Sequence, residues 1–153
     1  MAALERFVVE ETRLRGLRCS GFGIANQTLK QQLPLMAVDF PEIAHCHPGT
    51  INVELDSSLI ILHPDHRTKA IEWAPGRYEV FDLVRIGLEV PYGGIRRTAW
   101  LYVAHDSPHR ATPYIHEVIG PQIDFDSSRE IGIIIYRKCT RLAYQAQPTY
   151  VVE

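Results

Sequence analysis

The sequence predicts a mainly β, single-domain protein, and two observations lead to this fold class. Short apolar runs separated by glycine, proline and aspartate recur along most of the chain, which is the pattern of a β-rich domain. The clearest helical periodicity is confined to one early stretch. A small closed β-barrel with one inserted helix accommodates both observations better than alternating β-α units. No repeat or linker divides the chain, so residues 1–153 are expected to form one domain.

Strands are predicted wherever apolar and polar residues alternate. The first covers the second part of segment 7–19, where Leu14, Gly16 and Arg18 alternate with their neighbours. Further strands are predicted at 51–55, 59–62, 78–90, 96–104, 115–119 and 131–136, with a loop at 63–68 and a turn at 91–94.

One helix is predicted between the first two strands. Its apolar residues recur at intervals of four, three and four, and they are Leu29, Leu33, Met36 and Phe40. Asn26 or Thr28 is expected to cap its start, and Pro34 is expected to kink or divide it. Such a stripe indicates core packing.

The composition excludes several classes of partner. A net charge of −2 gives no electrostatic argument for binding nucleic acid or an anionic membrane. Three widely spaced cysteines fit reduced thiols better than a disulfide framework. The N-terminus lacks a signal-peptide pattern, and no apolar run has the length of a membrane helix. We therefore expect a soluble, cytoplasmic protein that binds neither nucleic acid nor membrane.

The stretch from His47 to Leu55 carries the most specific chemistry. Pro48-Gly49 predicts a turn, and the strand after it places Thr50, Asn52 and Glu54 on the face away from the core. Uncharged oxygens two residues apart on a strand can share one hard cation with phosphate and water. A polar strand face near a hairpin is the alternative interpretation.

Two further segments have residues suited to ligand binding. Gly21 and Gly23 follow the first strand, so their amide groups can approach phosphate oxygens, although a bulge or tight turn uses the same residues. Glu117 ends an apolar strand before a Gly-Pro turn, where a carboxylate can bind a hydroxyl group or accept its proton. A solvated strand-end side chain is the alternative for Glu117.

The histidine and cysteine residues point to no catalytic or metal site. Seven histidines are present, but no zinc-ligand spacing occurs among them and the cysteines. Cys46 lies between His45 and His47, yet nothing in the sequence lowers the pKa of its thiol.

Three motifs in this order resemble those of a known family. They are Leu14-x-Gly16-x-x-x-Ser20-Gly21-x-Gly23, then Pro48-Gly49-Thr50-Ile51-Asn52-Val53, then Glu117-Val118-Ile119-x-Pro121. Together they look like the archaeal-type CTP-dependent riboflavin kinases, over about positions 14 to 136. The Pro-Gly-Thr-x-Asn motif is the specific part of the resemblance.

The resemblance implies a six-stranded cradle-loop β-barrel that transfers the γ-phosphate of CTP to riboflavin, giving FMN and CDP. It implies that Thr50 and Asn52 are magnesium ligands and that Glu117 contacts the flavin. This agrees with the expectation that Glu117 orients or deprotonates the acceptor hydroxyl. Phosphoryl transfer needs mainly positioning and charge neutralisation, so few reactive side chains are expected. The nucleotide-binding residues that it implies are Gly21, Phe22, Gly23, Ile24, Ala25, Asn26, Gln122, Ile123, Asp124 and Phe125.

The chain departs from the family at several of these positions. Ala25 replaces a third glycine of the loop, and Ile24 replaces its acidic residue. The family's flavin-contacting threonine falls at His109, and Thr112 fits that role only with a gap. These departures leave two alternatives open: a non-catalytic nucleotide- or flavin-binding barrel, and a kinase of the same fold with a different donor or acceptor.

The stretch after Pro121 departs as well. In the family it usually ends in arginine, whereas here it reads Gln122 to Phe125. Asp124 can accept from an exocyclic amine, but no arginine in this stretch can donate to a base carbonyl. We therefore expect weaker discrimination between CTP and other triphosphates than in the family, with an amine-bearing base preferred over uracil.

Overall fold

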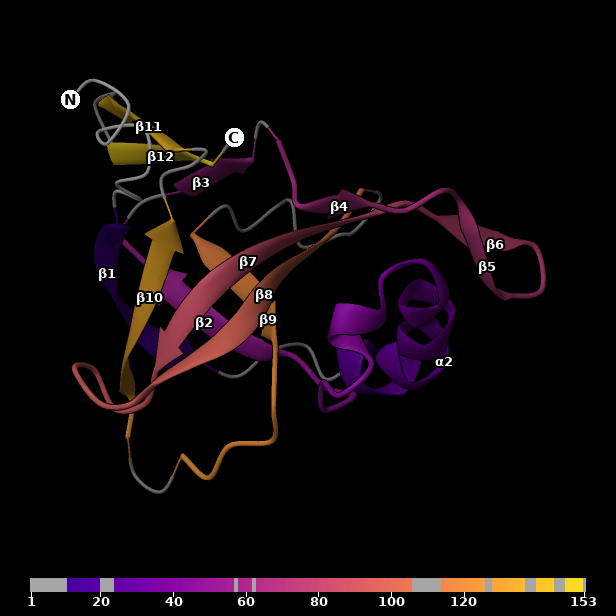
Figure 1. Ribbon diagram of the computed structural model, residues 1–153, viewed down its shortest axis with the longest axis horizontal. Coiled ribbons are helices and arrows are strands. Elements are labelled where there is room, and N and C mark those ends of the chain that lie inside the picture. The colour runs from indigo at the N-terminus through magenta and orange to yellow at the C-terminus, as the bar shows by residue number, and fades with distance from the viewer. Residues whose placement is uncertain are drawn as a thin grey trace, which may run out of the picture.

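The computed structural model describes residues 11–19, 24–56, 58–61, 63–105, 114–125, 128–136, 140–144 and 148–152. Within these ranges, only the backbone is described for residues 24–28, 58, 60, 140–144 and 148–152. These ranges form a mainly β structure with one α-helix (Figure 1). None of the described helices has the length and apolar character needed to cross a membrane.

Six strands form a ring closed by hydrogen bonds. They are β1 (Glu11–Cys19), β2 (Ile51–Leu55), β7 (Phe81–Glu89), β8 (Arg96–Ala104), β9 (Ile115–Ile119) and β10 (Glu130–Tyr136). Their order is β10-β1-β2-β9-β8-β7, and β7 pairs with β10 to close the ring. Every pairing in the ring is antiparallel. The short strand β4 (His66–Arg67) extends the sheet at the other end of β7.

Two smaller sheets accompany the ring. Strand β3 (Ser58–Ile61) pairs with β12 (Pro148–Val152), which pairs with β11 (Thr140–Tyr144). Strands β5 (Ile71–Ala74) and β6 (Arg77–Glu79) form a hairpin that projects from the ring beside the helix (Figure 1).

The first hydrophobic core fills the ring. Alternation along β7 directs Val84, Ile86 and Leu88 inward, and the other ring strands contribute in the same way. The buried residues of this core are Leu14, Val53, Leu55, Val84, Ile86, Leu88, Ala99, Leu101, Val118, Ile131, Ile133 and Ile135.

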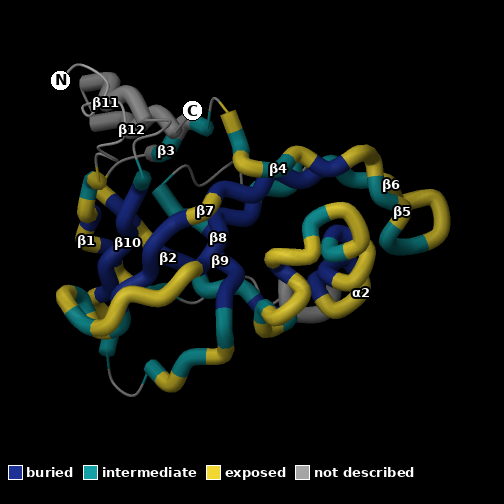
Figure 2. The backbone as a smooth tube through the Cα atoms, viewed as in Figure 1, coloured by how far each residue is buried: buried dark blue, intermediate teal, exposed yellow. Residues whose placement is uncertain are grey.

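The second core lies between the outer face of the ring and the helix α2 (Ile24–Asp39), which a 3₁₀ turn η1 (Pro41–Ile43) follows. Residues of β7, β8 and β9 that point away from the first core meet the helix here. Figure 2 shows β7 buried along almost all of its length, whereas β8 is buried in its middle and β9 at its end. The buried members of this core are Leu29, Leu33, Met36, Ile43, Phe81, Leu83, Trp100, Tyr102 and Ile119. The predicted helical stripe is therefore confirmed as core packing, with Phe40 just beyond the helix end.

Several predicted boundaries hold, and others need correction. Strands 96–104 and 115–119 and the turn at 91–94 lie where the sequence predicts them. The predicted strand 78–90 is divided, because residues 77–79 belong to the β5–β6 hairpin, and the predicted loop 63–68 contains β4. Strands β5, β11 and β12 were not predicted.

The helix also differs from its prediction. It begins at Ile24, before the expected caps Asn26 and Thr28, and Pro34 lies inside it without dividing it. A proline removes only one helical amide donor. Leu33 and Met36 are buried on either side of Pro34, so packing holds both halves in one helix.

One polar side chain lies on the inner side of β9. His116 shares its face with the core residue Val118, and its Nε2 accepts a hydrogen bond from the Leu59 amide at 3.2 Å. Burial lowers the pKa of His116 to about 4, so the ring stays neutral and keeps this acceptor. The bond ties β9 of the ring to β3 of the small sheet.

We expect stability to fall as the pH falls because of His116. The unfolded chain protonates this residue near its ordinary pKa of 6.5, whereas the folded protein leaves it neutral down to about 4. The unfolded state therefore binds more protons between these values, and from about pH 7 to about pH 5 His116 should remove about 2 kcal/mol of unfolding free energy. Urea unfolding of the wild type and of His116→Gln at both pH values measures this, since Gln keeps an acceptor but does not titrate. An equal loss in both proteins would contradict the assignment.

Candidate functional site

The pairing of β2 with β9 brings together two residues singled out in the sequence. Asn52 and Glu117 are direct cross-strand partners. Their neighbours Val53 and Val118 face the first core, so Asn52 and Glu117 point to the outer face of the ring. Both are buried, at 9% and 8% exposure.

This burial corrects two expectations. The face that carries Asn52 was predicted to lie away from any core, yet Asn52 is buried there, on the same outer face as Ile119 and Tyr102 of the second core. Glu54, the next polar residue of β2, is exposed as expected. Glu117 is not a solvated strand-end side chain, because it lies on the same covered face as Ile119.

Tyr102 extends this polar row onto the next strand. Leu101 pairs with Val118, and continuing the register by one residue sets Tyr102 opposite Glu117. The Tyr102 hydroxyl donates a hydrogen bond to Oε1 of Gln32 on α2 at 2.5 Å, and both residues are buried. Burial, with the nearby charges of Glu117 and Glu79, raises the pKa of Tyr102, so the phenol stays protonated and keeps its donor.

Sequence reasoning missed Tyr102 and Gln32. A signal for Gln32 exists, because it falls on the same helical face as Leu29, Leu33 and Met36 and is a polar residue at a core position. No comparable signal marks Tyr102, whose role follows from the strand register.

The side-chain oxygen of Asn52 has an unmet hydrogen-bonding requirement. Its Oδ1 is buried and accepts no hydrogen bond from any residue in the described part of the chain. A buried carbonyl oxygen without a donor is destabilising, so such atoms normally have a partner. This arrangement fits a ligand that supplies a donor or a cation.

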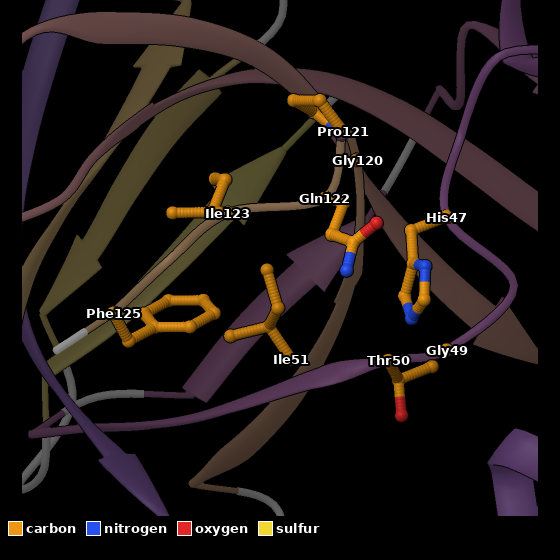
Figure 3. Close-up of a pocket in the computed structure, with 9 residues that line it drawn as sticks. All are labelled: His47, Gly49, Thr50, Ile51, Gly120, Pro121, Gln122, Ile123 and Phe125. Atoms are coloured by element: carbon orange, nitrogen blue, oxygen red, sulfur yellow. The ribbon is translucent and has the colours of Figure 1, made fainter.

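Thr50 adds a second oxygen on the same side of the strand. Figure 3 shows its hydroxyl pointing away from the direction taken by Ile51, as alternation requires. Magnesium takes few protein oxygens when phosphate and water complete its coordination, so Thr50 and Asn52 fit that ion. Across the described residues, no group of three or more His, Cys, Asp or Glu side chains could hold a metal ion.

A cavity of about 230 Å³ lies at the start of β2 (Figure 3). His47 and Gln122 lie toward one end of it, and Ile51, Ile123 and Phe125 toward the other. The His47 amide donates to the Gly120 carbonyl at 2.7 Å, which joins the Pro-Gly turn to the segment after β9. Gly49, Thr50, Gly120 and Pro121 complete the lining. Two of the three sequence motifs therefore border one amphipathic cavity.

The structure places the predicted nucleotide-binding residues in different settings. Gln122, Ile123 and Phe125 line the cavity, whereas Asp124 is exposed and does not. Ile24, Ala25 and Asn26 form the first turn of α2 instead of a loop. Alanine favours a helix where the family has glycine, which accounts for this difference. Gly21, Phe22, Gly23, His109 and Thr112 lie outside the described residues.

Neither described cysteine has the character of a nucleophile. Burial raises the pKa of the Cys46 thiol to about 11. Burial, and then the charge of Glu54, raises the pKa of Cys19, whose thiol contacts the Asn52 carbonyl oxygen at 3.7 Å.

Comparison of the sequence with known proteins identifies no relative of this chain. No protein-family model matches the chain, and no curated protein matches it. The description of the site therefore depends on its geometry.

We expect Asn52→Leu to leave the unfolding free energy unchanged or higher, because it removes a buried oxygen that accepts from no donor among the described residues. Gln32→Leu is the contrasting variant. It leaves the Tyr102 hydroxyl buried without its acceptor and should lower stability by about 1–3 kcal/mol. Urea unfolding measures both. A loss in Asn52→Leu as large as that in Gln32→Leu would show that Asn52 serves the fold and not a ligand.

Proposed function

We propose that this protein is a magnesium-dependent small-molecule kinase that transfers the terminal phosphoryl group of a nucleoside triphosphate, CTP, to riboflavin, giving FMN and CDP. In this proposal the six-stranded ring is the cradle-loop barrel of the riboflavin kinases that the sequence resembles. The observation that carries the proposal is the buried cross-strand pair of Asn52 and Glu117.

The pair sets oxygen ligands and a carboxylate on neighbouring strands. Thr50, just before β2, and Asn52 of β2 would hold magnesium, which when bound would neutralise charge on the phosphates of the donor. Glu117 of β9 lies directly opposite Asn52, within the distance of one strand pairing. A phosphate held at β2 and a hydroxyl held at β9 are therefore adjacent, which is the main requirement of phosphoryl transfer.

Glu117 is assigned to the acceptor hydroxyl. Its carboxylate orients that hydroxyl and accepts its proton as the oxygen bonds to the γ-phosphorus, while the bond from that phosphorus to the oxygen bridging to the β-phosphate breaks. The burial of Glu117 restricts the access of water, which would otherwise compete as the acceptor.

Two other elements support the donor. The first turn of α2 has backbone amides that are not used within the helix, and amides of this kind bind phosphate. The hydrogen bond between Tyr102 and Gln32 holds α2 against the sheet near Glu117. The amphipathic cavity takes the base, because three of the four residues at 122–125 line it.

The direct test is incubation with magnesium, each nucleoside triphosphate and riboflavin, with FMN followed by chromatography. Magnesium-dependent formation of FMN supports the proposal. Nucleotide or flavin binding without FMN would favour a non-catalytic barrel. Consumption of the triphosphate that depends on an alcohol other than riboflavin would favour a kinase with a different acceptor.

We expect the double variant Thr50→Val with Asn52→Leu to lose nucleotide affinity that depends on magnesium. It removes two oxygens and keeps side-chain shapes that suit a strand. Affinity should fall by at least about tenfold, roughly 1.4 kcal/mol, with little change in the thermal midpoint. Titration with and without magnesium measures this, and equal affinity in variant and wild type would remove the metal assignment.

Glu117→Gln is expected to slow transfer by about 10²–10⁴-fold, because it keeps size and hydrogen bonding but removes the proton acceptor. Nucleotide binding should persist. Glu54→Gln is the matched control, since Glu54 is an exposed carboxylate on β2 and should have no effect. Unchanged turnover in Glu117→Gln would show that this carboxylate has no part in transfer.

A further inference from the structure

A positively charged side chain from β1 lies against a residue that lines the cavity. The guanidinium of Arg18 is 4.5 Å from the centre of the Phe125 ring. Side chains four residues apart on a strand point to the same face, and Leu14 belongs to the core of the ring. Arg18 is therefore on the inner face, near the end of β1. Through Phe125 it lies next to the apolar end of the cavity, although Arg18 comes from a part of the sequence far from residues 122–125.

Among the described residues, Arg18 differs from the other arginines of its strand in its ion pairing. Arg13 and Arg15, on the same strand, pair with Glu89 at 3.0 Å and Glu130 at 3.1 Å. Arg18 forms no ion pair with any carboxylate in the described ranges. It is half-buried, and a guanidinium in such a position retains N–H donors for another group.

The backbone of Arg18 is nevertheless firmly held. Arg18 pairs with Val53 of β2, and its amide donates to the Arg129 carbonyl at 2.8 Å. The ring of Phe125 supports the side chain, since a planar guanidinium over an aromatic face is a favourable contact. A fixed backbone and a supported side chain give a donor whose position is set before a ligand binds.

We propose that Arg18 is a specificity-determining residue that donates to a carbonyl oxygen of the base of the bound nucleotide. This inference rests on the proposed function. The cavity near Arg18 is lined by Ile51, Ile123 and Phe125, which suits a flat, uncharged ring better than a phosphate. A planar guanidinium presents its N–H groups along its edge, in the geometry of a carbonyl acceptor.

The proposal changes the expectation drawn from the sequence. The stretch 122–125 has no arginine, but Arg18 supplies the donor that this stretch lacks. Cytosine, uracil and guanine have a ring carbonyl and adenine has none. The site should therefore favour the first three bases over adenine.

The test compares the wild type with Arg18→Met in titrations with CTP, UTP, GTP and ATP at one magnesium concentration. Methionine keeps an apolar stem over Phe125 and removes every donor. Affinity for CTP, UTP and GTP should fall by about tenfold or more, while affinity for ATP should change by less than about threefold. Arg15→Met is the matched control, because Arg15 lies on the same strand and also covers an aromatic ring, that of Tyr92, at 4.2 Å. It should change none of the four affinities.

The possible outcomes separate this inference from the proposed function. An equal loss of affinity for all four nucleotides would show that Arg18 contacts the phosphates, and this would overturn the inference. Unchanged affinity for all four would overturn it as well. In both cases the kinase proposal stands. If the wild type binds no triphosphate, the proposed function fails and the inference fails with it. Should Arg18→Met not fold, Arg18→Leu also removes every donor and keeps an apolar side chain beside Phe125, and the same selective loss is expected.

Discussion

The register of β2 against β9 is the constraint on which the site depends. It sets Asn52 opposite Glu117, with Val53 and Val118 facing the core of the ring. A slip of one residue in one strand would turn its valine outward and its polar residue into the core. The closed set of pairings prevents this, because each strand of the ring is held on both sides. The same apolar alternation that stabilises the ring therefore also positions the polar pair.

The outer face of the ring combines packing with polar chemistry. Helix α2 covers this face with Leu29, Leu33 and Met36, and it includes Gln32 as the one buried polar residue of its described side chains. The side-chain oxygen of Gln32 accepts a hydrogen bond from the Tyr102 hydroxyl, whereas the Asn52 side-chain oxygen has no donor among the described residues. A buried atom of this kind lowers stability unless a ligand uses it, and such local deficits are typical of functional sites.

The sequence was sufficient for features set by local pattern. Strands 96–104 and 115–119 follow from alternation, the turn at 91–94 from its Pro-x-Gly-Gly composition, and the helix from the spacing of Leu29, Leu33 and Met36. Features that depend on distant contacts were not predictable in this way. Alternation along β2 cannot indicate that the outer-face residue Asn52 is buried, and no local pattern relates Arg18 to Phe125. The helix start at Ile24 was not predicted, because the apolar stripe begins only at Leu29 and the helical preference of Ala25 is too weak a local signal to place the start.

The proposed role of the buried Asn52 oxygen is to bind magnesium together with a nucleotide. The most direct measurement is the NMR signal of the Asn52 side-chain amide, assigned by its absence in Asn52→Leu. We predict that this signal shifts when magnesium and CTP are added together and stays in place with magnesium alone. The signal of Gln32, whose oxygen is already bonded to Tyr102, should move much less. An Asn52 signal that does not move with magnesium and any nucleoside triphosphate would contradict the account.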